Sequence, residues 1–428
     1  MQPKYQPYEY SDPNLYAATR LPVYEATTLI PDAYRSPEFF EFERQRLWST
    51  SWVCVGYECQ IKQPGDILRV RVGGQQVFLV RNKQNELRAF YNVCRHRAAE
   101  LITEDTTHCS VIRCPYHGWG YSLDGRLLGA PFFQGLDIPT SVADIFRVRA
   151  EEQGKFCKED YSLLPVQVDS WAGLIFCNLS TESMPLKRWL GDLPERYCRH
   201  PLHELELVRR KRYEIQANWK LVAENFMEYY HLPTVHPELC NISGVTDHYR
   251  YQGPGMYTGM CTSPISDSPN TVRLDLPNYP GLDKTESVTV FFPLIFPNIA
   301  LWMFPNHLVT LLFQPVGATT TVEYMDILIH PSAKESSEPA IRELEEKLNH
   351  ITSFWDMVNW QDIRIVESVQ SGLLNQVYPG GRMCYEFEEP VHRFQNMVID
   401  RLLGVDRVPP GDTEPEVLGS NRLSRRLE

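Results

Sequence analysis

Short apolar runs separated by turn-forming residues dominate residues 51–180. Examples are "DILRVRV", "QQVFLV" and "GLIFCNL", and Gly, Asn and Asp gather between such runs. Runs of this length with turn formers on both sides are typical of β-strands. We therefore expect residues 51–180 to form a β-rich module. Residues 286–330 have the same character and are also expected to form strands.

Two other regions show helical spacing. Residues 213–232 include "NWKLVAENFMEYYHL", and Pro233 is expected to end this helix. Its apolar face consists of Trp219, Val222, Phe226 and Tyr229. Residues 336–374 begin with serines, a proline and acidic residues, which favour a helix N-terminus. The buried stripe of this second helix is expected at Ile341, Leu344, Leu348 and Ile351. The pattern therefore predicts a β-rich module followed by a mixed α+β module.

Composition narrows the class of protein. The chain has 428 residues, 43% of them hydrophobic, which is enough for about two or three domains with large cores. A net charge of -12 argues against nucleic acid as a partner. The most apolar window, residues 288–304, is 17 residues long and contains two prolines, so buried strands are expected there rather than a membrane span. The N-terminus lacks the features of a signal peptide, and the 11 cysteines form no disulfide framework. We expect a soluble, cytoplasmic protein.

The first candidate site combines two cysteines and two histidines. Cys94 and His96 are separated by one residue, Cys114 and His117 by two, and 17 residues lie between the pairs. Both pairs fall in turns of the β-rich module. Such a set can bind one tetrahedral zinc ion or a Rieske-type [2Fe–2S] cluster, in which two Cys hold one iron and two His the other. One Cys and one His in each of two loops, with the flanking "RHR" and "CPYHGW", favour the Rieske cluster.

A second candidate site follows in the chain, because a Rieske cluster only carries single electrons and an enzyme needs another centre for chemistry. The segment "AENFMEYYHLPTVH" offers Glu228, His231 and His236. Glu228 and His231 are three residues apart and are expected to share one face of a helix. Two histidines and one carboxylate form the facial triad of non-heme Fe(II). By themselves these residues are more typical of a surface or a helix cap, and the upstream Cys/His motif is what favours an iron site.

The stretches "CRHRAAEL" and "CPYHGWGYSLDGRL" closely resemble the Rieske domain of the ring-hydroxylating, or Rieske non-heme iron, oxygenase family. The resemblance continues through "EFERQRLWSTSWVCVG" and "WAGLIFCNL" and covers essentially the whole chain. It assigns the cluster to Cys94, His96, Cys114 and His117. It implies an α+β fold, in which an all-β Rieske domain at residues 46–181 is inserted in a helix-grip catalytic domain at residues 1–45 and 182–428. The antiparallel sheet of that catalytic domain would be covered by helices.

The resemblance also implies the iron ligands. The family pattern of Asn, acid, His and His matches Asn225, Glu228, His231 and His236, although Asp is commoner than Glu in the second place. The family's third ligand is an Asp eight residues before a Gln, which matches Asp362 and Gln370. The helical stripe that contains Asp362 continues through Val366, Val369 and Leu373. Asp362 is therefore expected to point inward, where an unpaired carboxylate is costly and a cation relieves the cost. A capping or salt-bridged aspartate is the alternative.

By the same resemblance, Glu228 connects two metal sites and is not an iron ligand. The family's acid at this place hydrogen-bonds an iron-ligand histidine and a cluster-ligand histidine of the next subunit. Carried over, Glu228 bridges His231 and His117 of a neighbouring subunit in a head-to-tail ring, most simply a homotrimer. A carboxylate that only orients His231 is the alternative.

The implied protein is the terminal oxygenase component of a multi-component system. A separate NAD(P)H-dependent reductase, with or without a ferredoxin, would supply electrons for the attack of O2 on a small substrate. Glu228 and the tail "YPGGRMCYEFEEPVHRFQNMVIDRLL" resemble members that oxidise choline, glycine betaine or carnitine. Quaternary ammonium groups bind aromatic faces. One face of the segment "IALWMF", either Ile299, Leu301 and Met303 or Ala300, Trp302 and Phe304, is expected to line the pocket.

Two other functions are compatible with the residues. An aromatic-ring dioxygenase would bind a neutral apolar substrate. An electron-transfer protein would use the Rieske domain alone, and would have no use for His231, His236 and Asp362.

Overall fold

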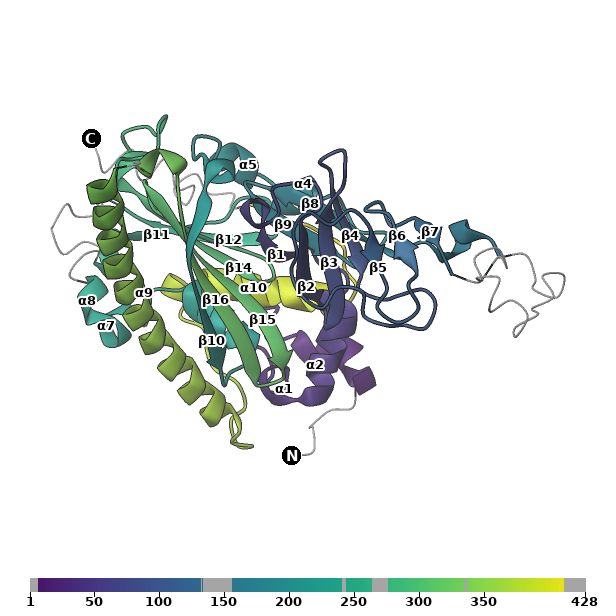
Figure 1. The fold of residues 1–428 in the computed structure, drawn as a ribbon. Helices are drawn as coiled ribbons and strands as arrows, with labels where there is room; N and C mark the ends of the chain where they lie inside the picture. The colour runs from purple at the N-terminus through teal and green to yellow at the C-terminus, as the bar shows by residue number, and fades with distance from the viewer. Residues whose placement is uncertain are drawn as a thin grey trace, which may run out of the picture. The chain divides into compact units, whose positions relative to one another are not determined.

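The chain divides into two compact units in the computed structural model, which describes residues 7–131, 133, 156–240, 244–263, 276–334 and 337–411. The smaller unit comprises Val55–Ser170 and Leu174–Glu182. The larger unit comprises Met1–Cys54, Trp171–Gly173 and Ser183–Glu428. The smaller unit is thus inserted in the sequence of the larger one, as the blue and teal segments of the ribbon illustrate (Figure 1).

The smaller unit is built from strands. A six-stranded sheet has the order β1-β9-β8-β4-β3-β2, and a three-stranded sheet has the order β5-β6-β7. The strands are β1 (Val53–Tyr57), β2 (Ile67–Val72), β3 (Gln75–Arg81), β4 (Leu87–Tyr91), β5 (Ile112–Arg113), β6 (Gly120–Tyr121), β7 (Leu127–Gly129), β8 (Pro165–Trp171) and β9 (Leu174–Asn178). The buried cluster that contains Phe78, Trp119 and Tyr121 also contains Cys94 and Cys114. Packing of this core therefore positions both sulfurs.

The larger unit is built on one seven-stranded antiparallel sheet of order β10-β16-β15-β14-β13-β12-β11. Its strands are β10 (Glu206–Ile215), β11 (His248–Tyr251), β12 (Tyr257–Thr262), β13 (Val290–Ile295), β14 (Ile299–Met303), β15 (His307–Gly317) and β16 (Thr320–Ile329). The apolar window at residues 288–304 forms β13 and β14, as expected. None of the helices in the described part of the chain is both long and apolar enough to cross a bilayer.

Helices accompany this sheet, and α9 runs along its β10–β16 side (Figure 1). They are α1 (Asp32–Arg35), α2 (Pro37–Glu43), α4 (Leu186–Leu190), α5 (Leu193–Arg196), α6 (Trp219–Phe226), α7 (Leu232–Val235), α8 (Pro237–Cys240), α9 (Glu338–Leu373) and α10 (Tyr385–Leu402). Ion pairs join Arg209 of β10 to Glu345 of α9, and Lys211 of β10 to Asp356 of α9. These pairs hold α9 against the edge strand of the sheet.

Helix α9 confirms the helix predicted at residues 336–374, but its buried face begins later than expected. Ile341 is 48% exposed, whereas Leu348 and Ile351 are buried. A helix of 36 residues is about 54 Å long, and a strand of 11 residues spans about 37 Å. The first turns of α9 therefore extend past the strands that could cover them. Val369, predicted to be buried, is 46% exposed, because the buried face near the C-terminus follows Ile363, Val366, Gln370 and Leu373.

The helix predicted at residues 213–232 is much shorter than expected. Residues 213–215 belong to β10, and α6 covers only Trp219–Phe226. Beyond α6, a carboxylate oxygen of Glu228 accepts hydrogen bonds from the backbone N–H groups of Tyr230 and His231. Side-chain acceptors of this kind compete with helical hydrogen bonds. Pro233 does not end a helix but lies in the first turn of α7, where proline is well tolerated.

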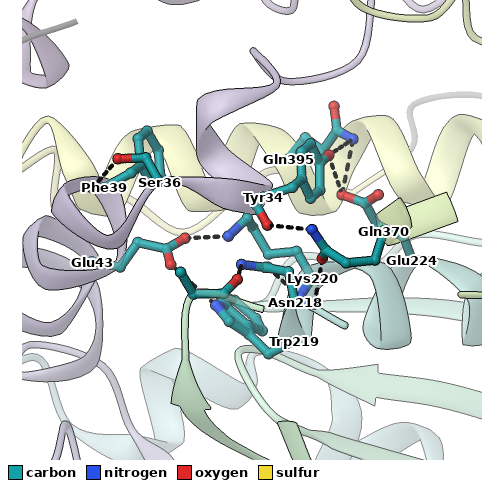
Figure 2. Close-up of polar contacts among 11 residues, drawn as sticks. Tyr34, Ser36, Phe39, Glu43, Asn218, Trp219, Lys220, Glu224, Gln370 and Gln395 are labelled. Carbon is teal, nitrogen blue, oxygen red and sulfur yellow. Dashed lines mark hydrogen bonds and ion pairs between the residues drawn. The ribbon is translucent and has the colours of Figure 1, made fainter. Parts of the chain in front are cut away.

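A buried polar network joins α6 to the N-terminal helices and to α10 (Figure 2). Lys220 Nζ and Glu43 Oε1 form a 2.6 Å ion pair between two fully buried side chains. Glu224 accepts hydrogen bonds from Tyr34 OH at 2.8 Å and from Gln395 Nε2 at 2.9 Å. Burial raises the pKa of the Glu224 carboxyl to about 7. The network is nearly all side chain, so α6 is fixed by specific partners as well as by apolar packing.

Gln370 joins α9 to the start of α6 (Figure 2). Its Oε1 accepts a hydrogen bond from the backbone N–H of Asn218 at 2.8 Å, and its Nε2 donates to the backbone carbonyl of Tyr34 at 3.1 Å. Asn218 in turn caps α6, because its side chain accepts a hydrogen bond from the backbone N–H of Lys220. This link fixes the position of α6 relative to α9.

Candidate metal centres

Two histidines and one aspartate meet in the larger unit. Among the residues that the structure describes, His231, His236 and Asp362 form the one group whose three possible ligand atoms lie within 4.8 Å of one another. Asp362 Oδ1 lies 2.8 Å from His236 Nε2 and 3.6 Å from His231 Nε2. His231 precedes α7, His236 follows it, and Asp362 comes from α9. The arrangement is that of a facial triad, with two imidazole nitrogens and one carboxylate oxygen on one side of a common point.

Both imidazoles are oriented by hydrogen bonds at their other nitrogen. His231 Nδ1 hydrogen-bonds Glu228, and His236 Nδ1 lies 2.7 Å from Gln361 Oε1. Each Nδ1–H therefore donates to an oxygen, which leaves the Nε2 lone pair of each ring available for a cation. Metal-binding histidines are commonly held in this way, by a hydrogen bond from the nitrogen that does not bind the metal. Burial lowers the pKa of His231, but the hydrogen bond and charge of Glu228 outweigh burial and raise it.

Asn225 holds the third member of the group. Asn225 Nδ2 donates to Asp362 Oδ1 at 2.7 Å. The contact crosses from the last turn of α6 to the middle of α9, so the sequence-predicted Asn225 and Asp362 come together through tertiary packing. Glu228 also contacts His231 as expected, but not as two positions on one helix face. Both residues lie in the non-helical segment between α6 and α7, and the turn formed by the Glu228 carboxylate brings them together.

A pocket opens on this group, with about 980 Å³ of space that includes its open mouth. The Ala300, Trp302 and Phe304 face of the "IALWMF" segment is the one that contributes, through Trp302 and Phe304. Trp302 and Trp355 pack with ring centroids 4.4 Å apart, and Phe226 stacks on Trp302 at 6.2 Å. The wall beside the triad is therefore aromatic.

Three polar side chains of this region were not predicted from the sequence: Gln361, Glu323 and Asn359. Gln361 lies beside Asp362 in the chain, but a glutamine on a helix indicates nothing about its partner. Glu323 and Asn359 are buried, line the pocket and contact each other. A sequence clue existed for Glu323, because it is an acid on the same strand face as Met325 and Ile327.

In the smaller unit, two tight loops present the four residues of the Cys/His motif. The first closes with backbone hydrogen bonds between Cys94 and both Ala98 and Ala99. In the second, the Gly118 N–H donates to the Cys114 carbonyl and the Cys114 N–H donates to the Trp119 carbonyl. Gly118 has φ +70°, a conformation that favours glycine. The rings of His96 and His117 are 4.6 Å apart at their centroids, and His96 stacks on Trp119. The sequence motif thus forms a local site from two short loops.

The geometry of this site is compatible with a cluster of two irons. Ligand atoms around a single zinc ion are at most about 4.6 Å apart. Within the described residues, no three of the four motif residues bring ligand atoms within 4.8 Å of one another. In a Rieske cluster the Cys-bound and His-bound irons are separate. Cys94 and Cys114 are buried in the core, whereas His117 is exposed. The Nδ1 atom of His96 is buried without a hydrogen-bond partner, as a metal ligand would be.

Comparisons with known proteins agree with both sites. The model of the Rieske [2Fe-2S] domain matches residues 51–140, and that of the ring hydroxylating alpha subunit catalytic domain matches residues 202–404. The carnitine monooxygenase oxygenase subunit of Acinetobacter baumannii is 28% identical over 85% of this chain and 92% of its own length. The glycine betaine monooxygenase oxygenase subunit of Pseudomonas aeruginosa is 27% identical over 86% and 88%. The chloroplastic choline monooxygenase of Arabidopsis thaliana is 27% identical over 88% and 83%.

Solved structures share the fold. The quaternary ammonium Rieske monooxygenase CntA in complex with L-carnitine is similar at a TM-score of 0.70 and 25% identity, over 88% of this chain and 96% of CntA. Naphthalene 1,2-dioxygenase from Rhodococcus sp. has a TM-score of 0.69 at 21% identity over 88% and 94%, which shows the fold alone.

The chain belongs to the Rieske-type ring-hydroxylating oxygenases, as the resemblance in its motifs implied. It is an oxidoreductase with an α+β fold, and its cofactors are a Rieske [2Fe–2S] cluster and a mononuclear non-heme iron. These conclusions confirm the predicted fold class, enzyme class and cofactors.

Proposed function

We propose that this chain is the oxygenase component of a monooxygenase that hydroxylates or N-demethylates a quaternary ammonium compound. The observation that carries the proposal is the group of His231, His236 and Asp362, which opens on an aromatic pocket in a chain that also contains a Rieske domain. The relatives named above act on carnitine, glycine betaine and choline, which share a trimethylammonium group. Aromatic faces bind such groups through cation–π attraction.

His231, His236 and Asp362 would hold the iron, which would supply the chemistry of O2. The protein's other residues would orient the iron ligands and exclude bulk water from the site. Glu228 and Gln361 hold the two imidazoles by Nδ1, and Asn225 holds the carboxylate of Asp362. His236 is only 2% exposed, so bulk water is largely excluded from it.

Cys94, His96, Cys114 and His117 would hold the Rieske cluster in a domain at residues 46–181, with the catalytic domain at residues 1–45 and 182–428. The compact unit at Val55–Ser170 and Leu174–Glu182 supports these boundaries. Electrons would come from a separate NAD(P)H-dependent reductase, directly or through a ferredoxin, since the relatives are oxygenase subunits. We place the enzyme in the cytoplasm, because all 11 cysteines are free of disulfides.

The two alternatives are less well supported. An electron-transfer protein would not need the facial triad or the pocket beside it. An aromatic-ring dioxygenase would share the fold, but the similarity to naphthalene 1,2-dioxygenase is confined to the fold.

An oxygen-uptake screen tests the substrate class. With a surrogate reductase and NADH, the metal-loaded enzyme is expected to consume O2 on addition of choline, carnitine or glycine betaine, and not on addition of naphthalene. The reason is that an aromatic wall beside acidic groups favours a cation over a neutral arene. Product analysis by mass spectrometry shows whether uptake is coupled to oxidation. Coupled oxidation of arenes alone would favour the ring dioxygenase.

We further propose that Glu228 connects His231 to His117 of a neighbouring subunit in a homotrimer. In a structure of a related quaternary ammonium Rieske monooxygenase, 27% identical over 88% of this chain, electron transfer between subunits is a reported feature. The exposure of His117 and the contact between Glu228 and His231 support the same route here.

Glu228→Gln is expected to keep both metal centres and the oligomer but to slow electron delivery by about tenfold or more, because the carboxylate charge that attracts imidazole protons is lost. Stopped-flow absorbance of the reduced enzyme, mixed with O2 and substrate, measures this rate. Glu238→Gln, an exposed acid on α8, is the matched control and is expected to behave as the wild type. Loss of iron with a normal rate would instead make Glu228 a support of His231 alone, and a fully active monomer would exclude the inter-subunit route.

A further inference from the structure

The pocket wall contains a buried acid that the metal site does not use. Glu323 of β16 lies opposite Tyr213 of β10 and Phe313 of β15, and its side chain is 1% exposed. It lines the same pocket as His231, His236 and Asp362. Its neighbour Asn359 precedes Asp362 by three residues on α9, so the two positions are one helical turn apart. The acid is therefore near the reacting centre but outside the facial triad.

Among the residues that the structure describes, Glu323 has a single hydrogen-bond partner and no cation. Asn359 Nδ2 donates to Glu323 Oε1 at 2.6 Å, and the described part of the chain provides no ion pair for this carboxylate. The two basic residues that precede Tyr213 on β10 have other partners: Arg212 pairs with Glu214 at 2.7 Å, and Lys211 pairs with Asp356 at 2.6 Å. Burial raises the pKa of Glu323 to about 7, with a smaller contribution from the charge of Asp362. A buried carboxylate of this kind is costly until a cation joins it.

Apart from its histidines and the proposed iron, the ionisable side chains of the pocket are all acids. Its lining includes three acids, Glu228, Glu323 and Asp362, and no lysine or arginine from the residues that the structure describes. A ligand carboxylate would find no guanidinium or ammonium partner on these walls. The indole N–H of Trp355 is buried without an acceptor, which suits a neutral oxygen such as a hydroxyl but does not offset a full negative charge. Trp302, Trp355 and Phe304 line the same pocket and provide aromatic surface for a cation.

From these observations we infer that Glu323 is the anionic anchor for the ammonium group, and that the substrate is a cation without a carboxylate, such as a trimethylammonium alcohol. The inference rests on the proposed function and narrows it. The inference distinguishes a choline-like substrate from zwitterions such as carnitine and glycine betaine, on which two of the relatives named above act. Asn359 is the positioning residue that holds the Glu323 carboxylate.

Isothermal titration calorimetry of the metal-loaded protein with three probes tests the inference. Choline carries the ammonium group and an alcohol, 3,3-dimethylbutan-1-ol is its neutral isostere, and glycine betaine adds a carboxylate. The wild type is expected to bind choline at least about tenfold more tightly than either other probe. Glu323→Gln keeps the size and the Asn359 contact, and is expected to weaken choline binding by about tenfold or more while the affinity for the isostere changes less than about twofold.

Glu346→Gln, an exposed acid on α9, is the matched control and is expected to leave all three affinities unchanged. Equal binding of glycine betaine and choline by the wild type would overturn the substrate inference. Unchanged choline binding by Glu323→Gln, or an equal loss for the neutral isostere, would overturn the anchor. A wild type that binds neither ammonium probe would instead overturn the proposed function, and the inference with it.

Discussion

Turnover is expected to disappear in Asp362→Ala and in His236→Ala, while the visible absorption and EPR spectra of the Rieske cluster remain. Each change removes one of the three atoms that meet within 4.8 Å, and the two remaining ligands are not expected to hold Fe(II) firmly. Iron per chain should fall from about three to about two, because the cluster keeps its own two irons. Metal analysis and acid-labile sulfide measured on the same sample check both numbers.

Two further variants distinguish the proposed iron ligands from residues that only hydrogen-bond to them. Gln361→Ala removes only the partner of His236 Nδ1 and is expected to weaken iron binding by about 10- to 100-fold without abolishing it. Glu346→Ala on the exposed face of α9 is the control and should keep full activity. If Asp362→Ala keeps three irons and normal turnover, Asp362 is not a ligand and Glu228 becomes the next candidate.

The buried ion pair between Lys220 and Glu43 is expected to contribute strongly to stability. Lys220→Met is expected to lower the free energy of unfolding of the catalytic unit by about 3–5 kcal/mol, because it leaves the Glu43 charge buried without its cation. The indole N–H of Trp219, 3.2 Å from Glu43 Oε2, would be the main remaining donor. Urea denaturation followed by far-UV circular dichroism measures the change.

Comparison variants show whether the loss comes from the unpaired charge. Lys187→Met removes an exposed lysine on α4 and should change the free energy of unfolding by less than about 0.5 kcal/mol. The double variant Glu43→Leu/Lys220→Met removes both charges and is expected to recover a large part of the loss. A loss below about 1 kcal/mol in Lys220→Met would show that water or a neighbouring group satisfies Glu43.

Local patterns predicted much of this protein. The strands at residues 51–180, the long helix α9 and the Cys/His loops all depend on neighbours close in the sequence. Cys94 and His96, and Cys114 and His117, are each presented by one tight turn, so the spacing alone indicated the candidate cluster site. The proposed metal roles of His231 and His236 have the same local origin, because they flank the single turn of helix α7.

Contacts between residues far apart in the sequence could be established only from the tertiary structure. Asp362 meets His236 only because α9 packs on α6, held there by the contact between Gln370 and Asn218. The family resemblance pointed to Asp362, whereas helical periodicity could not distinguish an inward acid from a capping one. The predicted helix across Glu228 was wrong because a side-chain carboxylate took the backbone N–H groups that a helix needs.

The charge of the pocket also depends on the tertiary structure and not on local sequence. A strand pattern places Glu323 on a face, but only the packed sheet and α9 leave it buried and paired with Asn359, with no cation among the described residues. The sequence by itself therefore determined the family and the local loops that form the candidate cluster site. The packing of α6, α9 and the sheet decided which acids meet which bases, because the energy of a buried charge depends on groups that the chain brings together from more than a hundred residues away.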